Sequence, residues 1–209
     1  MINVEITPRK LKILDFDIEV RPLAWYSGDF VTKQPTGIGW KWIGVKVPVT
    51  TRLIGESFDT RRVLEEEKVM IEAFREAYDE ADIVTGHFIR DFDLRTLDGA
   101  CIRLGIKPLG QKLTICTKED FHKTSGLSRS MQNLSAMFEA QHQKFPMNTA
   151  LWAKANMLLP EGIALTRQRL IHDVKEHEEL FTTMRQRGLL RGPQWWTPAA
   201  GGRAGRYHA

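Results

Sequence analysis

The stretch LDFDIEV, residues 14–20, constrains the fold more than any other part of the chain. Apolar and acidic residues alternate in it, and side chains two positions apart on a strand point to the same face. The pattern predicts a strand over residues 12–20, with one apolar face and one face bearing the carboxylates of Asp15, Asp17 and Glu19. Neighbouring carboxylates repel unless a cation or a proton holds them together. That face is therefore either solvated or the site of a metal ion.

The rest of the chain divides into strands and then alternating helices and strands. Period-two alternation and short apolar runs predict further strands at residues 36–47, 51–54, 82–86 and 113–117. Apolar residues at helical spacing, with capping and stop residues at the ends, predict helices at residues 61–81, 93–105, 130–140, 148–158 and 161–186. This order of elements favours an α/β fold whose sheet has mixed strand directions.

The domain organisation expected is one domain, residues 1–187, followed by a basic tail, residues 188–209. The tail is rich in Gly, Pro and Ala, which favours an extended or flexible segment. It contains Trp195 and Trp196, which either anchor it to the domain or touch a partner.

Composition excludes some classes of protein. No apolar run approaches the roughly 20 residues that span a bilayer, and the first residues lack the pattern of a signal peptide, so a cytoplasmic protein is expected. Cys101 and Cys116 form neither a disulfide framework nor a zinc pattern, and both are interpreted as structural thiols. The formal net charge is +4, but three of the basic residues lie in the tail, so composition indicates a nucleic-acid partner only weakly.

Asp93 and Asp173 are two further acidic residues that are candidates for a functional site. Asp93, within GHFIRDFDLRTL, stands where a strand has ended and a helix begins, and its ordinary role there is to cap the helix. Asp91 is placed to cap equally well. Asp173 lies in the middle of the last helix beside an apolar stripe, where pairing with Lys or Arg is the usual role of an isolated Asp.

Taken together, these residues resemble the motifs of a known family. Asp17-x-Glu19 on the first strand, Asp93 at a later strand-to-helix turn and Asp173 on the final helix resemble the three motifs of the DEDD superfamily of DnaQ-like 3′–5′ exonucleases. FDIE and DIVTGHFIRDFDL resemble the proofreading domains of replicative polymerases, and the middle segment and tail resemble free-standing bacteriophage exonucleases. The resemblance covers about residues 12–180 and implies a ribonuclease H-like, mixed five-stranded sheet flanked by helices.

The resemblance also implies an activity. It predicts hydrolysis of phosphodiester bonds from the 3′ end of DNA, single-stranded or frayed, as proofreading for a separate replicative polymerase. Two divalent cations about 3.5–4 Å apart supply the nucleophile and offset the developing charge in such reactions, and oxygen ligands suit Mg²⁺ or Mn²⁺. By resemblance, Asp17 bridges both ions, Glu19 and Asp173 bind the nucleophile's ion, and Asp93 binds the other. Asp15 lies outside the motif and is expected to have a supporting or structural role.

The chain departs from the family pattern just before Asp173. The family usually places a Tyr four residues or a His five residues before this Asp, where the chain has Arg169 and Gln168. Arginine cannot act as a base, but Arg169 can hold a phosphate oxygen or balance the carboxylates one turn away. In the second motif Phe88 replaces a usual Asn and either stacks on a terminal base or belongs to the core.

The general base is therefore not identified by the sequence. His172 is expected at the surface and His177 in a buried structural role, while His122 and His142 on the middle segment are further candidates. The missing Tyr or His leaves a second hypothesis, a catalytically inactive nucleic-acid-binding module on the same fold. The presence of all four carboxylates argues for the nuclease.

Overall fold

A computed structural model describes residues 10–23, 32–122, 126–142 and 145–198. In these residues a single sheet of six strands has the order β3-β2-β1-β4-β5-β6. The strands are β1 Ile13–Leu23, β2 Thr32–Trp42, β3 Thr50–Leu53, β4 Ile83–Gly86, β5 Lys112–Cys116 and β6 Gln194–Trp196. β1 pairs antiparallel with β2 and parallel with β4, β4 and β5 are parallel, and both edge strands are antiparallel to their neighbours. The expected mixed α/β sheet is confirmed.

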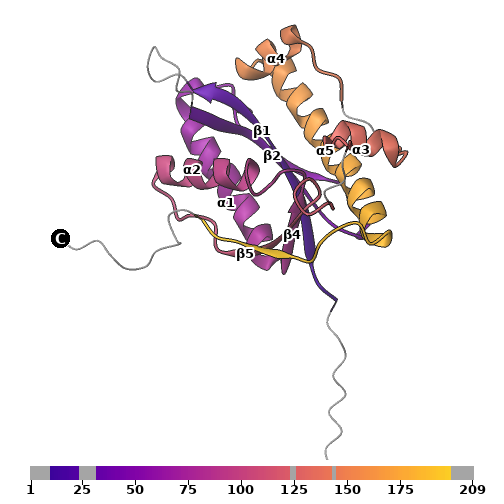
Figure 1. Cartoon of the computed structure of the whole chain (residues 1–209). Coiled ribbons are helices and arrows are strands. Elements are labelled where there is room, and N and C mark those ends of the chain that lie inside the picture. The colour runs from indigo at the N-terminus through magenta and orange to yellow at the C-terminus, as the bar shows by residue number, and fades with distance from the viewer. Residues whose placement is uncertain (1–9, 24–31, 123–125, 143–144, 199–209) are drawn as a thin grey trace, which may run out of the picture.

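Helices cover both faces of the sheet (Figure 1). α1 Val63–Glu80 and α2 Asp93–Leu104 pack on one face, and α5 Pro160–Gln186 lies across the other, on β1 and β2. α3 Met131–Met137 and α4 Thr149–Asn156 contact α5, and a short 3-10 helix, Thr60–Arg62, precedes α1. Among the residues described, no helix is both long and apolar enough to cross a membrane.

The alternation in β1 divides its side chains between these two layers. Leu14, Phe16 and Ile18 are buried in the main core with residues of α1 and α2; the ring of Phe16 lies 4.9 Å from that of Phe74, centroid to centroid. Ile13 packs instead with Phe181 of α5. The acidic face of β1 therefore lies beneath α5, and it is not the solvated face of an edge strand.

Local signals account for several helix ends. Ser130 Oγ accepts a hydrogen bond from the backbone N–H of Asn133, 3.3 Å, at the start of α3. Asn148 Oδ1 accepts one from Leu151, 2.9 Å, at the start of α4. Gly105 follows α2 in the left-handed conformation, with φ of 65°, which ends the helix at little steric cost.

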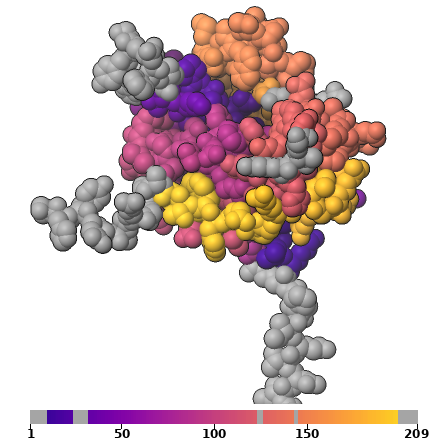
Figure 2. Space-filling view, in the orientation of Figure 1, coloured from indigo at the N-terminus to yellow at the C-terminus, as the bar shows by residue number. Residues whose placement is uncertain are grey.

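The sixth strand corrects the expectation of five. β6 comes from residues 188–209, the segment expected to be a tail, and pairs with β5 at the edge of the sheet. Trp196 is 7% exposed and belongs to the main core, whereas Trp195 is 63% exposed. In Figure 2 the yellow part of this segment, which ends at residue 198, lies on the surface of the domain. A three-residue strand among Gly and Pro is too short to show a period, and it forms because β5 offers backbone groups for pairing.

Two glycines in β2 allow α5 to lie close to the sheet. Gly39 is paired with Asp17 and Gly37 with Glu19. A Cβ at Gly37 would lie 2.7 Å from Leu170 Cδ1, and one at Gly39 would lie 3.1 Å from Leu170 Cβ. Because these positions have no side chain, Leu170 of α5 fills the space above them, which sets the height of the helix over the two acidic residues.

Candidate metal centre

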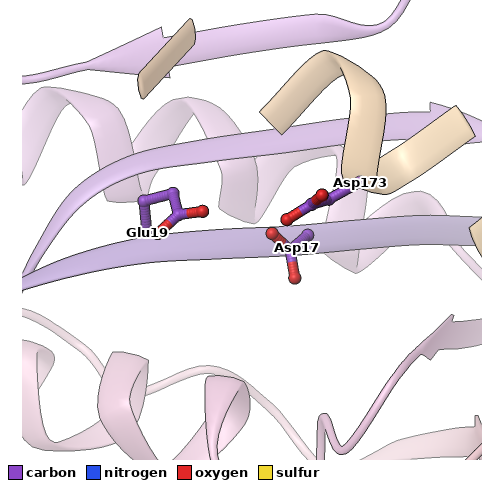
Figure 3. A group of neighbouring side chains, drawn as sticks. All are labelled: Asp17, Glu19 and Asp173. Atoms are coloured by element: carbon purple, nitrogen blue, oxygen red, sulfur yellow. The ribbon is translucent and has the colours of Figure 1, made fainter. Parts of the chain in front are cut away.

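Three carboxylates converge between β1 and α5. Asp17, Glu19 and Asp173 each offer an oxygen, and these three oxygens lie within 4.8 Å of one another. Figure 3 shows Asp173 reaching down from α5 toward the two side chains of β1. Glu19 is 8% and Asp173 3% exposed, and Asp17 is half-buried. Three of the four acidic residues predicted from the sequence are thus brought together, although 154 positions separate Glu19 from Asp173.

A β-bulge ends the regular pairing beside this group. Glu19 is paired with Gly37 but Val20 with Pro35, so Thr36 is the extra residue of β2. Bulges bend a strand and redirect the side chains next to them. Glu19 is therefore the last residue of β1 before the change of register, which separates the acidic group from the remainder of the hairpin.

Arg169 neutralises part of this negative charge. Its Nε donates a hydrogen bond to Glu19 Oε1, and its Nη2 lies 3.2 Å from Asp173 Oδ2. Burial disfavours the charged guanidinium, but the neighbouring carboxylates outweigh that effect and raise the pKa of Arg169. The expectation that Arg169 balances the carboxylates is confirmed; its contact with a substrate phosphate stays a prediction.

Asp93 lies beside the group of three without being part of it. It is in the first turn of α2, 2% exposed, and its Oδ1 accepts a hydrogen bond from the backbone N–H of Ile18, 3.2 Å. Burial raises the pKa of Asp93 to about 7; backbone N–H groups oppose this rise and the charge of Glu19 adds to it. The N-cap residue of α2 is Phe92, so Asp93 contacts the strand between Asp17 and Glu19 instead of capping its helix.

His177 has the buried structural role expected from the sequence. It is 3% exposed, its Nδ1 lies 2.7 Å from Asp15 Oδ1, and its Nε2 lies 3.0 Å from Thr117 Oγ1. Thr117 Oγ1 also lies 2.9 Å from Nδ1 of His87. Sequence reasoning did not identify Thr117 or His87, because this chain of hydrogen bonds joins four segments that no local pattern connects.

The other histidines considered as general bases, His122, His142 and His172, contact groups outside the three carboxylates. His142 Nδ1 lies 2.5 Å from Glu179 Oε1, and Glu179 is six residues beyond Asp173, about 9 Å along the helix axis. His122 is exposed, and its backbone N–H donates to Leu189, beyond the end of α5. The ring of His172 lies 5.9 Å from that of Phe145, centroid to centroid. These contacts identify no general base.

Phe88 follows β4 in a conformation that is uncommon for its residue type. Its φ is 69°, in the left-handed region that side chains with a Cβ rarely adopt. Its backbone N–H donates to Cys116 Sγ, 3.1 Å, and Lys118 Nζ lies 3.7 Å from the centre of its ring. The ring is half-buried. Stacking of Phe88 on a base stays a prediction.

Comparison with known proteins supports the fold. No protein-family model and no curated protein matches the sequence. Among solved structures, the chain is similar to the family B DNA polymerase from the hyperthermophilic archaeon Pyrobaculum calidifontis, with a TM-score of 0.53 and 17% sequence identity. The match covers 87% of this chain and 25% of the polymerase chain. At this identity the likeness establishes the fold: the chain has the architecture of a segment of a family B DNA polymerase.

Proposed function

We propose that the protein is a divalent-cation-dependent 3′–5′ exonuclease that hydrolyses phosphodiester bonds from the 3′ end of DNA. The observation that carries the proposal is the convergence of Asp17, Glu19 and Asp173, from β1 and α5, on one point. These residues are three of the four that resemble the DEDD motifs, and the fold on which they lie is similar to part of a DNA polymerase.

The donor set fits the cations proposed. All of its ligand atoms are carboxylate oxygens, which suit Mg²⁺ or Mn²⁺ better than softer metals. Gathering three acidic side chains at partly buried positions is unfavourable unless positive charge accompanies them. Arg169 supplies one such charge for the three carboxylates. A bound cation would supply the further positive charge that the group needs.

Each residue of the site would have a separate role in binding the cations or the substrate. Asp17, Glu19 and Asp173 would hold one of two cations. Asp93, which accepts a hydrogen bond from the backbone N–H of Ile18 between Asp17 and Glu19, would help Asp17 hold the second. Such ions, when bound, acidify water and offset the charge that develops on phosphate. Arg169 would face a phosphate oxygen of the substrate, and Phe88 would stack on a terminal base.

The proposed substrate is single-stranded or frayed DNA, with proofreading for a separate polymerase as the biological setting. The polymerase-like fold supports this setting, as does the resemblance of FDIE and DIVTGHFIRDFDL to proofreading domains. The excess of basic over acidic residues is also compatible with a polyanionic partner.

The test is digestion of labelled single-stranded DNA and RNA, with each end blocked in turn, in Mg²⁺, Mn²⁺ or EDTA. The expected result is a ladder that starts at the 3′ end of DNA and disappears in EDTA. Asp17→Asn and Asp173→Asn should lower the rate at least a hundredfold, about 2.7 kcal/mol in the barrier. Asp79→Asn, an exposed residue of α1, is the control and should keep the wild-type rate. Binding of DNA without hydrolysis in any metal would instead support the inactive binding module.

A further inference from the structure

Arg169 makes contacts that a bound cation would have to displace. Its guanidinium contacts two of the three members of the carboxylate group, Glu19 and Asp173. We propose that Arg169 is a built-in counter-ion of this group, which competes with divalent cations and yields the two carboxylates when a cation binds. The inference rests on the proposed metal centre and adds to it a residue that weakens its affinity for metal.

The buried position of the arginine makes the competition strong. Arg169 is 7% exposed and lies between Glu19, 8% exposed, and Asp173, 3% exposed. Ionised groups removed from water need compensating charge, and the carboxylates raise the pKa of Arg169, so it stays charged. The arginine therefore stabilises the group when no metal is bound.

A divalent cation and the guanidinium would share the same two carboxylates. Two positive charges beside the same carboxylates repel each other, and the repulsion is stronger in a partly buried site than in water. Binding of the cation must therefore also break or weaken the ion pairs of Arg169 with Glu19 and Asp173. This cost lowers the affinity for metal relative to a site with a neutral side chain at position 169.

Two contacts of Arg169 lie outside the carboxylate group and would hold the guanidinium after a cation displaces it. Its Nη1 donates to the backbone carbonyl of Phe145, 3.2 Å, and its Cζ lies 5.1 Å from the ring centre of Trp152 in α4. These contacts keep the guanidinium beside the metal centre after it leaves the carboxylates. A phosphate at that position would replace the lost anionic partner, so substrate and metal should favour each other's binding.

The test is the affinity for Mn²⁺ alone, measured by electron paramagnetic resonance of free Mn²⁺, without nucleic acid. Arg169→Gln should bind Mn²⁺ about tenfold more tightly than the wild type or better. The matched control is Arg167→Gln, on the same helix, because Arg167 pairs with Glu56 and Thr51 outside the carboxylate group. It should stay within about twofold of the wild type. Arg169→Lys retains a charge and should stay closer to the wild type than Arg169→Gln.

The melting temperature is a second measurement, which detects any loss of stability in Arg169→Gln. In EDTA, Arg169→Gln should melt below the wild type, because Glu19 and Asp173 lose their counter-ion, and Mn²⁺ should raise its melting temperature by more than it raises that of the wild type. Equal or weaker Mn²⁺ affinity in Arg169→Gln, or equal tightening in Arg169→Lys, would overturn the competition while leaving the nuclease proposal standing. Absence of Mn²⁺ binding in every variant would overturn the metal centre itself.

Discussion

His177 Nδ1 lies 2.7 Å from Asp15 Oδ1, and this buried pair joins the same two elements that carry the candidate metal ligands. Asp15 is two residues before Asp17 on β1, and His177 is four residues after Asp173 on α5. The pair is thus one strand repeat and about one helical turn away from the metal centre. It fixes α5 against β1 next to the point where their carboxylates must meet.

Replacing His177 should therefore destabilise the domain. Burial raises the pKa of Asp15, and the hydrogen bond and charge of His177 oppose that rise; without His177, Asp15 is left in the interior without its partner. His177→Phe should lower the free energy of unfolding by about 3 kcal/mol, as expected for a broken buried pair, measured by urea denaturation in EDTA.

The control is His142→Phe. His142 also pairs with a carboxylate, Glu179, but its side chain is 40% exposed, and exposed pairs contribute about 1 kcal/mol or less. An equal loss of stability in the two variants would show that the Asp15–His177 pair has no special part in holding α5.

Gly39 should be needed for the height of α5 above the sheet. In Gly39→Ala the new Cβ would lie 3.1 Å from Leu170 Cβ, a tight contact that Leu170 and the adjoining turn of α5 must relieve by shifting a few tenths of an ångström. Overpacking of this kind costs about 1–3 kcal/mol, and it moves Asp173 away from Asp17. The variant should bind Mn²⁺ more weakly and melt at a lower temperature.

Gly99→Ala tests whether this effect is specific to the contact with α5. Gly99 is an exposed residue of α2, and a Cβ there meets nothing within 4 Å. Because alanine is the better helix former by about 1 kcal/mol, the control should be slightly more stable and keep its Mn²⁺ affinity. Unchanged affinity in Gly39→Ala would contradict the role given to Gly39.

Asp93 should make the stability of the metal-free protein depend on pH. Burial raises its pKa from 3.8 to about 7, so the folded state holds the proton more tightly than the unfolded state does. The contribution of this proton is present at pH below 3.8, is lost progressively as the pH rises, and is gone above about 7. Asp93→Asn has no such proton to lose.

The measurement is a set of melting curves in EDTA between about pH 4 and pH 8 for the wild type and Asp93→Asn. The variant should gain stability relative to the wild type as the pH rises through this window, since only the wild type must ionise a buried carboxyl. Parallel pH profiles would indicate that Asp93 titrates at its ordinary value, 3.8, in the folded protein.

Trp196 should contribute far more to stability than its neighbour. Trp196 is 7% exposed and packs in the main core, whereas Trp195 is 63% exposed. Trp196→Ala should cost about 3–5 kcal/mol, the usual range for a buried aromatic residue. Trp195→Ala should stay within about 0.5 kcal/mol, as for other surface substitutions. Equal effects of the two substitutions in chemical denaturation would rule out β6 as a part of the folded domain.

Much of the fold could be predicted because it depends on local periodicity. Alternation in residues 14–19 put the apolar residues of β1 on one face and its acidic residues on the other, as observed. The helix expected at residues 161–186 is Pro160–Gln186, and the one expected to end at Gly105 ends there. These features follow from the geometry of a strand or a helix within one segment.

What lies opposite the acidic face was decided by tertiary structure. The alternation of residues in β1 places Asp17 and Glu19 on one face of the strand. Their approach to Asp173 depends on Gly37 and Gly39 in β2, which allow α5 to lie close to the sheet. The ion pair between Arg169 and Glu19 joins residues 150 positions apart. The raised pKa of Asp93 comes from its burial, and β6 exists because β5 has an edge to pair. Each depends on packing and desolvation between distant segments, which local periodicity does not specify.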